Sequence, residues 1–354
     1  TTTGKLSLKT KEKVLLRTAL YQYFYLERIP LYAICNETLE IARRFCHPQF
    51  VKFLNALLRK VETSTVHLPE DNSIEALSVR YSYPVFFVDR LIEAFGLDKS
   101  IEILKAGNQA SRTMLRMRSK NALDDWPENA YSFVENTNKE IAIIHDSELI
   151  GKATAFPGLY IQNATPYSLM HFLKDGSSNP QCVFDVCASP GGKLLLAHDF
   201  FPTAELYAND VSLQKIEQLQ ENITKYELKV TLSCGPGENI NTGQKYDLII
   251  LDVPCSNTGV LNKRPEARWR LSKEQIGKTI EIQKKLLERA VSMLSPEGEI
   301  WYLTCSILPA ENQDMVSEMS KKLKLSIRKM KTQVPNAAGF DGGFGCALKF
   351  ATQL

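Results

Sequence analysis

The sequence predicts an α/β protein with a doubly wound sheet domain at residues 161–354, a small α+β subdomain within residues 76–160, and an all-helical module at residues 1–75. Three observations support this prediction. After residue 180, apolar runs of strand length alternate with helical stretches, which is typical of a parallel sheet. Residues 113–118 and 140–144 read as short strands. In the first 75 residues, apolar side chains recur at the spacing of amphipathic helices.

Two apolar stripes, in residues 16–24 and 50–58, indicate that the first module consists of short helices. The helical pattern continues from residue 78 to about residue 109 and then gives way to alternation. We therefore predict a helical linker followed by a small, RRM-like α+β subdomain. Arg112, Arg116 and Arg118 share one face of the first predicted strand, where they either contact phosphates or simply face solvent.

Composition excludes few classes of protein. The chain has 354 residues, of which 44% are hydrophobic and 23% charged, and a net charge of +3, which are the values of an ordinary globular protein. The eight cysteines include no Cys-x-x-Cys pair and there is no paired histidine spacing, so we expect no metal site. No apolar run approaches membrane-spanning length. We therefore expect no membrane contact, free thiols in a reducing cytoplasm, and a monomer.

The main domain starts with a strand, a glycine-containing turn and a helix start at residues 181–193. Gly191 and Gly192 allow a ligand to approach the backbone closely, and the first N–H groups of the helix favour an anion. The turn is neither G-x-G-x-x-G nor a P-loop, which disfavours dinucleotides and nucleoside triphosphates. Asp210 ends the next strand, where a carboxylate can bind both ribose hydroxyls. This pairing indicates S-adenosylmethionine (SAM); the simpler alternative is that Asp210 caps the following helix.

Two cysteines are expected at neighbouring strand ends. The apolar run at residues 248–251 ends in Asp252 and Pro254, which predicts a central strand covered on both faces. Because Pro254 cannot continue that strand, Cys255 should lie at the edge where open α/β sheets bind ligands. A second apolar segment ends at Cys305, after a helical stretch at about residues 273–294 and a turn at residues 295–298. A right-handed crossover would place both thiols in one crevice.

Two thiols, a carboxylate and a methyl donor suit a target carbon that is not nucleophilic unaided, such as C5 of a pyrimidine. A thiolate that adds at C6 makes C5 a carbanion-like centre, and loss of the C5 proton with expulsion of the thiol completes methyl transfer. Asp252 can hydrogen-bond the exocyclic amine and N3 of the base. The residues alone leave open which cysteine attacks.

Four segments resemble the motif series of the Sun/Fmu family of RNA cytosine-C5 methyltransferases. They are DVCASPGGK at residues 185–193, DVPCSNTG at 252–259, RW at 268–269 and TCS at 304–306. Residues 12–60 are similar to the latter part of a NusB-like RNA-binding domain. The chain opens at Thr1 without the first half of such a domain, which indicates truncation or a shortened natural form. The resemblance implies a Rossmann-like, SAM-dependent methyltransferase that acts on RNA.

The resemblance also implies roles for individual residues. Cys305 is expected to be the nucleophile, Cys255 to assist product release, and Asp252 to contact the cytosine and the cofactor side of the pocket. Asp210 is expected on the ribose, and the methionine end of SAM is expected along Cys187, Ala188, Ser189, Pro190, Gly191, Gly192 and Lys193. A basic segment interleaved with an aromatic ring follows Cys255, so RNA contacts are expected at Lys263, Arg264, Arg268 and Trp269.

The predicted function is formation of 5-methylcytosine in RNA, with 16S (small-subunit) ribosomal RNA as the expected substrate. The alternatives are tRNA as the substrate, a catalytically silent RNA-binding or ribosome-assembly factor, and a DNA methyltransferase in which Cys255 would attack. The chain departs from the family pattern at three positions. Cys234 stands where an acid near the adenine is usual, and Ser189 and Asn257 stand where alanine and glycine are frequent.

Overall fold

The structure, a computed structural model, describes residues 7–61, 68–119 and 121–351. The chain divides into two compact units, residues 1–68 (unit 1) and residues 69–354 (unit 2). The predicted helical module also includes residues 1–6 and 62–67, which lie outside the described residues. The finer domain boundaries at residues 75 and 160 stay predictions.

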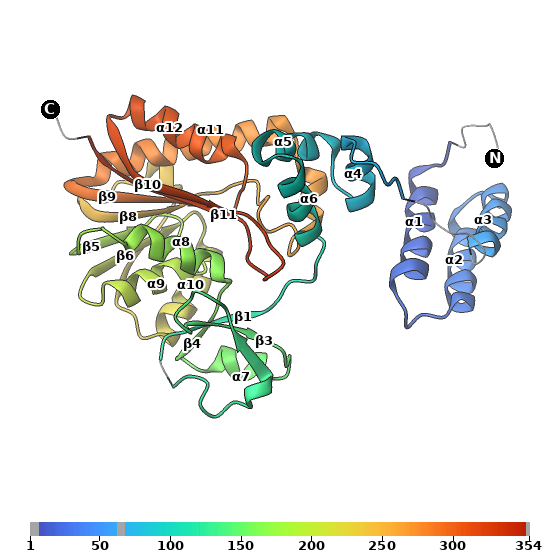
Figure 1. The fold of residues 1–354 in the computed structure, drawn as a ribbon, viewed down its shortest axis with the longest axis horizontal. Coiled ribbons are helices and arrows are strands. Elements are labelled where there is room, and N and C mark those ends of the chain that lie inside the picture. The colour runs from blue at the N-terminus through green and yellow to red at the C-terminus, as the bar shows by residue number, and fades with distance from the viewer. Residues whose placement is uncertain (1–6, 62–67, 120, 352–354) are drawn as a thin grey trace. The chain divides into compact units, whose positions relative to one another are not determined.

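The described part of unit 1 is helical, as predicted, and its helices pack around a small apolar core (Figure 1). Leu54 and Leu58 come from the second predicted stripe and are fully buried in this core, together with Ala19 from the first. The helices are α1 (Thr10–Tyr25), α2 (Leu31–Phe45) and α3 (Pro48–Val61).

Unit 2 begins with a helical group that is followed by a small antiparallel sheet. The helices α4 (Ile74–Tyr81), α5 (Val85–Phe95) and α6 (Leu97–Ala106) share an apolar cluster with Leu261, Ile307 and Leu308. The small sheet has the strand order β2-β3-β1-β4 within the described residues. Its strands are β1 (Met114–Met117), β2 (Tyr131–Phe133), β3 (Ile141–Ile144) and β4 (Leu159–Ile161), with α7 (Leu149–Ala155) packed beside them.

The main sheet has the order β10-β11-β9-β8-β5-β6-β7 in the described chain. Strands β9, β8, β5, β6 and β7 are parallel to one another, and β11 runs antiparallel to both of its neighbours, β9 and β10. This is the predicted Rossmann-like sheet. Its strands are β5 (Cys182–Asp185), β6 (Glu205–Asp210), β7 (Val230–Cys234), β8 (Tyr246–Asp252), β9 (Leu294–Thr304), β10 (Leu325–Gln333) and β11 (Gly343–Phe350). Short 3-10 helices span Glu128–Ala130, Gly237–Asn239, Pro265–Arg270 and Pro309–Glu311.

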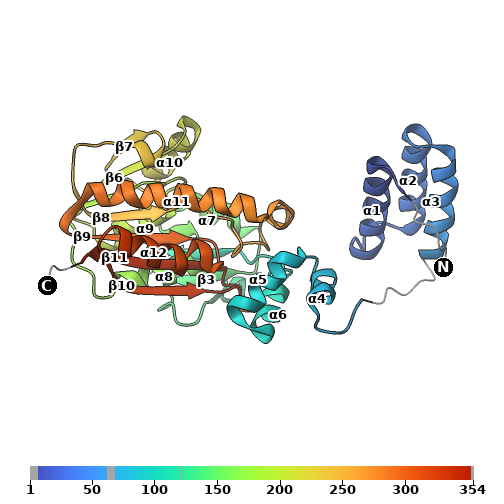
Figure 2. The same ribbon diagram turned by 90° about the horizontal axis from the view of Figure 1, so that it is seen from above.

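Helices cover both faces of the main sheet (Figures 1 and 2). On one face lie α8 (Ala164–Lys174), α9 (Gly192–Phe200) and α10 (Leu213–Lys225), and on the other α11 (Lys273–Met293) and α12 (Gln313–Lys322). Alternate residues of β8 enter opposite cores: Leu248 and Ile250 pack with the first helices, and Ile249 and Leu251 with the second. The prediction of a central strand covered on both faces is confirmed.

One predicted boundary differs from the structure. Strand β9 begins at Leu294, whereas the sequence suggested a turn at residues 295–298 before the strand. Pairing explains the difference, because Leu294 already lies opposite Tyr246 of β8 and the hydroxyl of Ser295 donates to Asp247 Oδ1 at 2.9 Å. Among the helices described in the structure, none has both the length and the apolar character needed to cross a membrane.

Candidate active site

The two predicted cysteines lie together at the carboxyl ends of β8 and β9. These strands are parallel neighbours, and Asp252 lies opposite Leu303 in their register. The chain leaves β8 at Asp252 and β9 at Thr304, so each thiol follows directly on the loop. Cys255 Sγ and Cys305 Sγ are 3.0 Å apart. The prediction that the two thiols lie side by side at neighbouring strand ends is therefore confirmed.

Asn257 connects the two thiol loops. The Cys305 thiol donates to Asn257 Oδ1 at 3.1 Å, and Asn257 Nδ2 donates to the carbonyl of Cys255 at 3.1 Å. The backbone of Asn257 is left-handed, with φ 59°, a conformation that asparagine and glycine adopt more readily than other residues. This explains how asparagine replaces the glycine that is frequent in the family at this position, and it adds a contact that glycine lacks.

Burial and the neighbouring thiol determine the protonation state of Cys255. The hydrogen bond with Cys305, together with burial, raises the pKa of Cys255 well above its usual range. Cys255 therefore stays a neutral thiol at pH 7. A protonated Cys255 is suited to donating a hydrogen bond rather than to attacking a carbon atom, because the thiolate is the nucleophilic form of cysteine.

The buried carboxylate of Glu311 lies beneath both cysteine loops. Its Oε1 accepts from the backbone N–H of Ser256 at 2.8 Å and from Gln283 Nε2 at 3.3 Å, and its Oε2 accepts from the hydroxyl of Ser306 at 2.6 Å and from that of Ser256. Ser256 and Ser306 each follow one of the cysteines, so one side chain connects the two loops. The role of Glu311 could not be predicted from the sequence. Its partners Ser256 and Gln283 are 55 and 28 positions away along the chain, and its third partner, Ser306, is an uncharged loop residue.

Lys193 and Asp252 form an ion pair at the cofactor edge, with Lys193 Nζ 2.6 Å from Asp252 Oδ2. Burial lowers the pKa of Lys193, but the adjacent Asp252 outweighs burial, and the net pKa lies above the usual value. Asp185 lies fully buried at the end of β5, where burial and the charge of Asp252 raise its pKa to about 8 against the opposing effect of Lys193. The glycine turn and the Cys255 loop are thus electrostatically coupled.

Both glycines of the turn lie too close to neighbouring side chains to carry a Cβ atom. Gly191 has φ 109°, and a Cβ there would lie 2.9 Å from Leu219 Cδ1; a Cβ at Gly192 would lie 2.9 Å from Tyr160 Cε1. Helix α9 begins at Gly192, so its first N–H groups have no partner within the helix. Cys187, on the preceding loop, is half-buried, and burial raises its pKa, so it stays a neutral thiol. The turn at Cys187, Ala188, Ser189, Pro190, Gly191, Gly192 and Lys193 therefore fits the carboxylate of SAM.

Asp210 lies at the carboxyl end of β6, beside this turn. Its Oδ2 accepts from the backbone N–H of Ser189 at 2.9 Å, and its Oδ1 accepts from that of Val211 at 2.7 Å and lies 3.1 Å from Lys215 Nζ. The N-cap position of α10 is Ser212, whose side chain makes no capping hydrogen bond, so the alternative interpretation of Asp210 as the helix cap is wrong. Cys234, exposed at the end of β7, pairs with Asp210 in the sheet and so lies at the same edge.

A small cavity of about 50 Å³ adjoins Cys305. Its lining includes Lys193, Thr165 and Asp341. Asp341 belongs to the segment before β11, and its backbone carbonyl accepts from Thr165 Oγ1 at 2.7 Å. The cavity lies between the Cys305 thiol at the end of β9 and Lys193, the cation of the ion pair with Asp252.

The predicted RNA contacts fall into two groups. Arg264 is exposed, Trp269 is 67% exposed, and Lys263 pairs with the buried carboxylate of Asp341. Arg268 is buried instead, and its guanidinium donates to Asn108 Oδ1 at 2.6 Å and to the carbonyl of Gly107. The expectation of an RNA contact at Arg268 is therefore corrected, because its donors are engaged by the protein.

The strand arginines also need a correction. Arg116 is 2% exposed and both Arg116 and Arg118 pair with Asp199 of α9, so neither of the two is a free solvent-facing or phosphate-binding cation. Arg112 is exposed. The paired arginines connect the small sheet to the helix that follows the glycine turn.

Comparison with protein families decides the assignment. The sequence model of the family described as 16S rRNA methyltransferase RsmB/F matches residues 173–351, which include both cysteines, the glycine turn and Asp210. The chain belongs to the RsmB/F family. The NusB family model matches residues 4–63. The resemblance to the Sun/Fmu family and to a NusB-like domain is thereby confirmed.

Relatives and solved structures agree with membership of the RsmB/F family. Ribosomal RNA small subunit methyltransferase B of Shewanella oneidensis is 29% identical over 355 residues, which cover 95% of this chain and 79% of that protein. The protein of the same name from Escherichia coli O6:H1 is 29% identical over 311 residues, with 84% and 71% covered. The crystal structure of PH0851 matches with a TM-score of 0.79 at 20% identity over 97% of this chain and 83% of that one. A methyltransferase homologue from Pyrococcus horikoshii matches with a TM-score of 0.67 at 20% identity over 79% and 99%.

RsmB/F membership makes the chain an enzyme, an rRNA methyltransferase with SAM as its cofactor. The prediction of a SAM-dependent RNA methyltransferase is confirmed at this level, and the alternative of a catalytically silent assembly factor is not supported. The fit of the glycine turn and Asp210 to SAM agrees with this assignment.

Proposed function

We propose that the chain forms 5-methylcytosine in 16S (small-subunit) ribosomal RNA, with Cys305 as the nucleophile and Cys255 as the residue that assists release. The observation that supports this most strongly is the pair of thiols 3.0 Å apart at the ends of β8 and β9, beside the ion pair of Lys193 and Asp252. A reaction that used one thiol alone would not require a second cysteine beside the first.

In the proposed reaction, the Cys305 thiolate adds to C6 of cytosine, and the C5–C6 electron pair makes C5 nucleophilic. Bound SAM supplies an electrophilic methyl group. The ionised Asp252 accepts a hydrogen bond from the exocyclic amine, and Lys193 beside it offsets the negative charge that builds on the ring. Transfer of the C5 proton to solvent water then re-forms the C5–C6 double bond and expels Cys305 as a thiolate, and the net products are 5-methylcytosine, S-adenosylhomocysteine and a proton.

The proposed role of Cys255 follows from its protonation. Because its pKa is raised, Cys255 keeps its proton and can donate a hydrogen bond to the departing Cys305 sulfur, 3.0 Å away. The TCS motif at residues 304–306 and the NusB domain argue against the DNA-methyltransferase alternative, in which Cys255 would be the attacking thiolate. Asn257, through Cys305 and the Cys255 carbonyl, keeps the two sulfurs aligned.

Support for 16S rRNA as the substrate comes from the family description and from the names of the relatives. With rRNA as the substrate, we also propose a cytoplasmic location. Lys263, Arg264 and Trp269 are the proposed RNA contacts near the crevice, since they start a few positions after Cys255 and the last two are exposed.

The proposal is tested by methyl transfer from labelled SAM to 16S rRNA, with tRNA and DNA in parallel reactions. We expect label in 5-methylcytosine of 16S rRNA and none after Cys305→Ala. Label in tRNA alone would move the substrate to tRNA, and full activity of Cys305→Ala would remove that residue from the nucleophile's role.

A further inference from the structure

A groove of about 460 Å³ lies on unit 2 between the small sheet and the segment that precedes β11. We call it the flanking groove. The small sheet contributes Arg112 and Phe133, β10 contributes Lys331, and the segment before β11 contributes Asn336 and Phe340. None of these residues belongs to the SAM edge or to the thiol pair.

The flanking groove shares a wall with the cavity beside Cys305. Phe340 lines the groove and the next residue, Asp341, lines the cavity. Asn163 holds the segment that forms this wall in place. Its Nδ2 donates to the carbonyl of Gly339 at 2.9 Å, and its Oδ1 accepts from the N–H of Asp341 at 3.0 Å. An RNA with its target base at the Cys305 thiol would therefore place a neighbouring nucleotide at the groove.

The charges of the flanking groove suit a phosphate. Arg112 is exposed, and its side chain lies along the shared wall, because a Cβ at Gly339 would be 3.1 Å from Arg112 Cδ. Within residues 7–61, 68–119 and 121–351, Arg112 and Lys331 have no salt bridge to a carboxylate. One acid, Glu135, also lines the groove, so the cations outnumber it.

The flanking groove also presents aromatic faces and amides. Phe133 is 37% exposed at the end of β2, and Phe340 is half-buried on the opposite wall. Between them, Asn136 occupies a left-handed turn with φ 59° and lines the groove together with Asn336. Aromatic faces with cations and amide groups are the means by which proteins bind unpaired nucleotides, through stacking, phosphate contacts and base-edge hydrogen bonds.

We propose that the flanking groove binds a nucleotide next to the target cytosine in single-stranded RNA, with its phosphate on Arg112 and Lys331 and its base on the more exposed ring, Phe133. This rests on the proposed function, because it takes the cavity beside Cys305 as the place of the target base. The groove is thus a substrate-recognition site that acts before and independently of the chemistry at the thiols.

The test measures binding of 16S rRNA transcribed in vitro by the full chain, before and after Arg112→Ala, Lys331→Ala and Phe133→Ala. Each lost phosphate contact should lower the slope of log K against log salt concentration by about 0.7. Loss of the stacking face in Phe133→Ala should raise the Kd at least about 5-fold. Arg112→Lys should retain most of the slope, since it keeps the charge.

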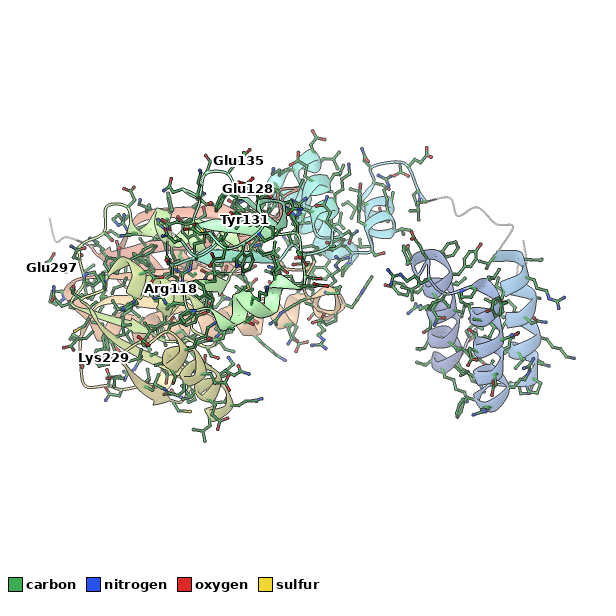
Figure 3. All side chains as sticks on the ribbon, turned by 90° about the horizontal axis from the view of Figure 1, so that it is seen from below. Arg118, Glu128, Tyr131, Glu135, Lys229 and Glu297 are labelled. Atoms are coloured by element: carbon green, nitrogen blue, oxygen red, sulfur yellow. The ribbon has the colours of Figure 1, made fainter. Side chains whose placement is uncertain are left out.

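Lys229→Ala is the matched control. Lys229 lines a different groove beside β7 and lies on the side of unit 2 away from Glu135 (Figure 3). It should change neither the Kd nor the slope beyond the effect of a distant charge. Calorimetric SAM binding, expected to be the same in all variants, shows that each one is folded.

The outcomes separate the two proposals. Unchanged Kd and salt slope in Arg112→Ala, Lys331→Ala and Phe133→Ala, with normal methylation by the unaltered chain, would overturn the flanking groove alone. Absence of methyl transfer by the unaltered chain, with the binding effects present, would overturn the proposed function and retain the groove. If Lys229→Ala changed the Kd and the salt slope as much as Arg112→Ala, the effect of Arg112 would be general electrostatic attraction for RNA. That result would contradict a specific nucleotide site in the flanking groove.

Discussion

Among single residues, Glu311 has the contacts that most directly explain how two loops keep their thiols together. It touches neither the cofactor edge nor the cavity, but it accepts from the backbone or hydroxyl groups of Ser256 and Ser306. Its charge also contributes to the raised pKa of Cys255, after the hydrogen bond with Cys305, burial and the electrostatic effect of Cys305. Glu311 is therefore a positioning residue.

Glu311→Ala should lower the free energy of unfolding by roughly 1–3 kcal/mol, because it leaves the backbone N–H of Ser256 without an acceptor and removes a charged acceptor from the hydroxyls of Ser256 and Ser306. It should also lower kcat more than it changes the KM for RNA. Urea unfolding and methyl-transfer kinetics measure these effects. Glu318→Ala is the control, since Glu318 is an exposed acid on the neighbouring α12. Equal stability of the two variants would contradict the role given to Glu311.

Asp185 predicts a pH dependence of stability. Burial raises its folded-state pKa from 3.8 to about 8. The folded protein therefore binds a proton that the unfolded chain has released between about pH 4 and pH 8, and this group's contribution to stability falls as pH rises through that window. Asp185→Asn should stabilise the fold more at pH 8 than at pH 5, as thermal unfolding at both pH values would show. A gain of equal size at the two pH values would be inconsistent with a raised pKa.

At the scale of elements, the loop between β8 and α11 is attached to the helices α4, α5 and α6 by Arg268. The Arg268 guanidinium donates to Asn108 and Gly107 and lies 4.1 Å from the centre of the Tyr83 ring. The segment from β8 to α11 also contains the motif at residues 252–259. The hydrogen bonds of Arg268 therefore help to hold the loop that carries Cys255 in place. The motif residue Arg268 is thus structural, whereas its neighbour Trp269 is exposed.

Arg268→Ala should lower the free energy of unfolding by about 1.5–3 kcal/mol, the range for hydrogen bonds to a charged group. The salt slope of RNA binding should stay the same, because Arg268 contacts no phosphate in this account. Arg270→Ala, at an exposed position two residues on, serves as the control. A reduced salt slope with unchanged stability would restore the RNA contact first expected at Arg268.

The sequence predicted elements to different degrees. Strands β5, β6 and β8 were predictable because buried parallel strands read as apolar runs, and α11 because its apolar residues recur at helical spacing. The strands β2 and β4 have three residues each, too few for a periodicity. Strand β10 was missed because it is an edge strand with the charged sequence LSIRKMKTQ. The two thiols were predictable from their strand ends, while Glu311 was not, because its contacts form only after folding.

At the scale of the whole molecule, unit 2 contains its own buried clusters on both faces of the main sheet, and unit 1 has a separate core. The residues that fit SAM and the thiol pair all belong to unit 2. Cofactor binding and the thiol chemistry are therefore properties of unit 2, and the NusB domain of unit 1 is expected to contribute to RNA binding.

A chain of residues 69–354 should fold and bind SAM with the affinity of the full chain, while its affinity for 16S rRNA should fall. Calorimetry with SAM and filter binding with RNA measure the two quantities. Loss of SAM binding in a folded unit 2 would show that the site needs unit 1. Unchanged RNA affinity would limit RNA recognition to unit 2.

We propose that Cys305 attacks the base and that Cys255 assists its release. The most direct test is mass spectrometry of the protein–RNA adduct that accumulates when Cys255→Ala is incubated with SAM and 16S rRNA. We predict a methylated cytosine attached to the peptide that contains Cys305, and no adduct in Cys305→Ala. An adduct at Cys255 in the Cys305→Ala variant would reverse the roles of the two thiols and contradict the account.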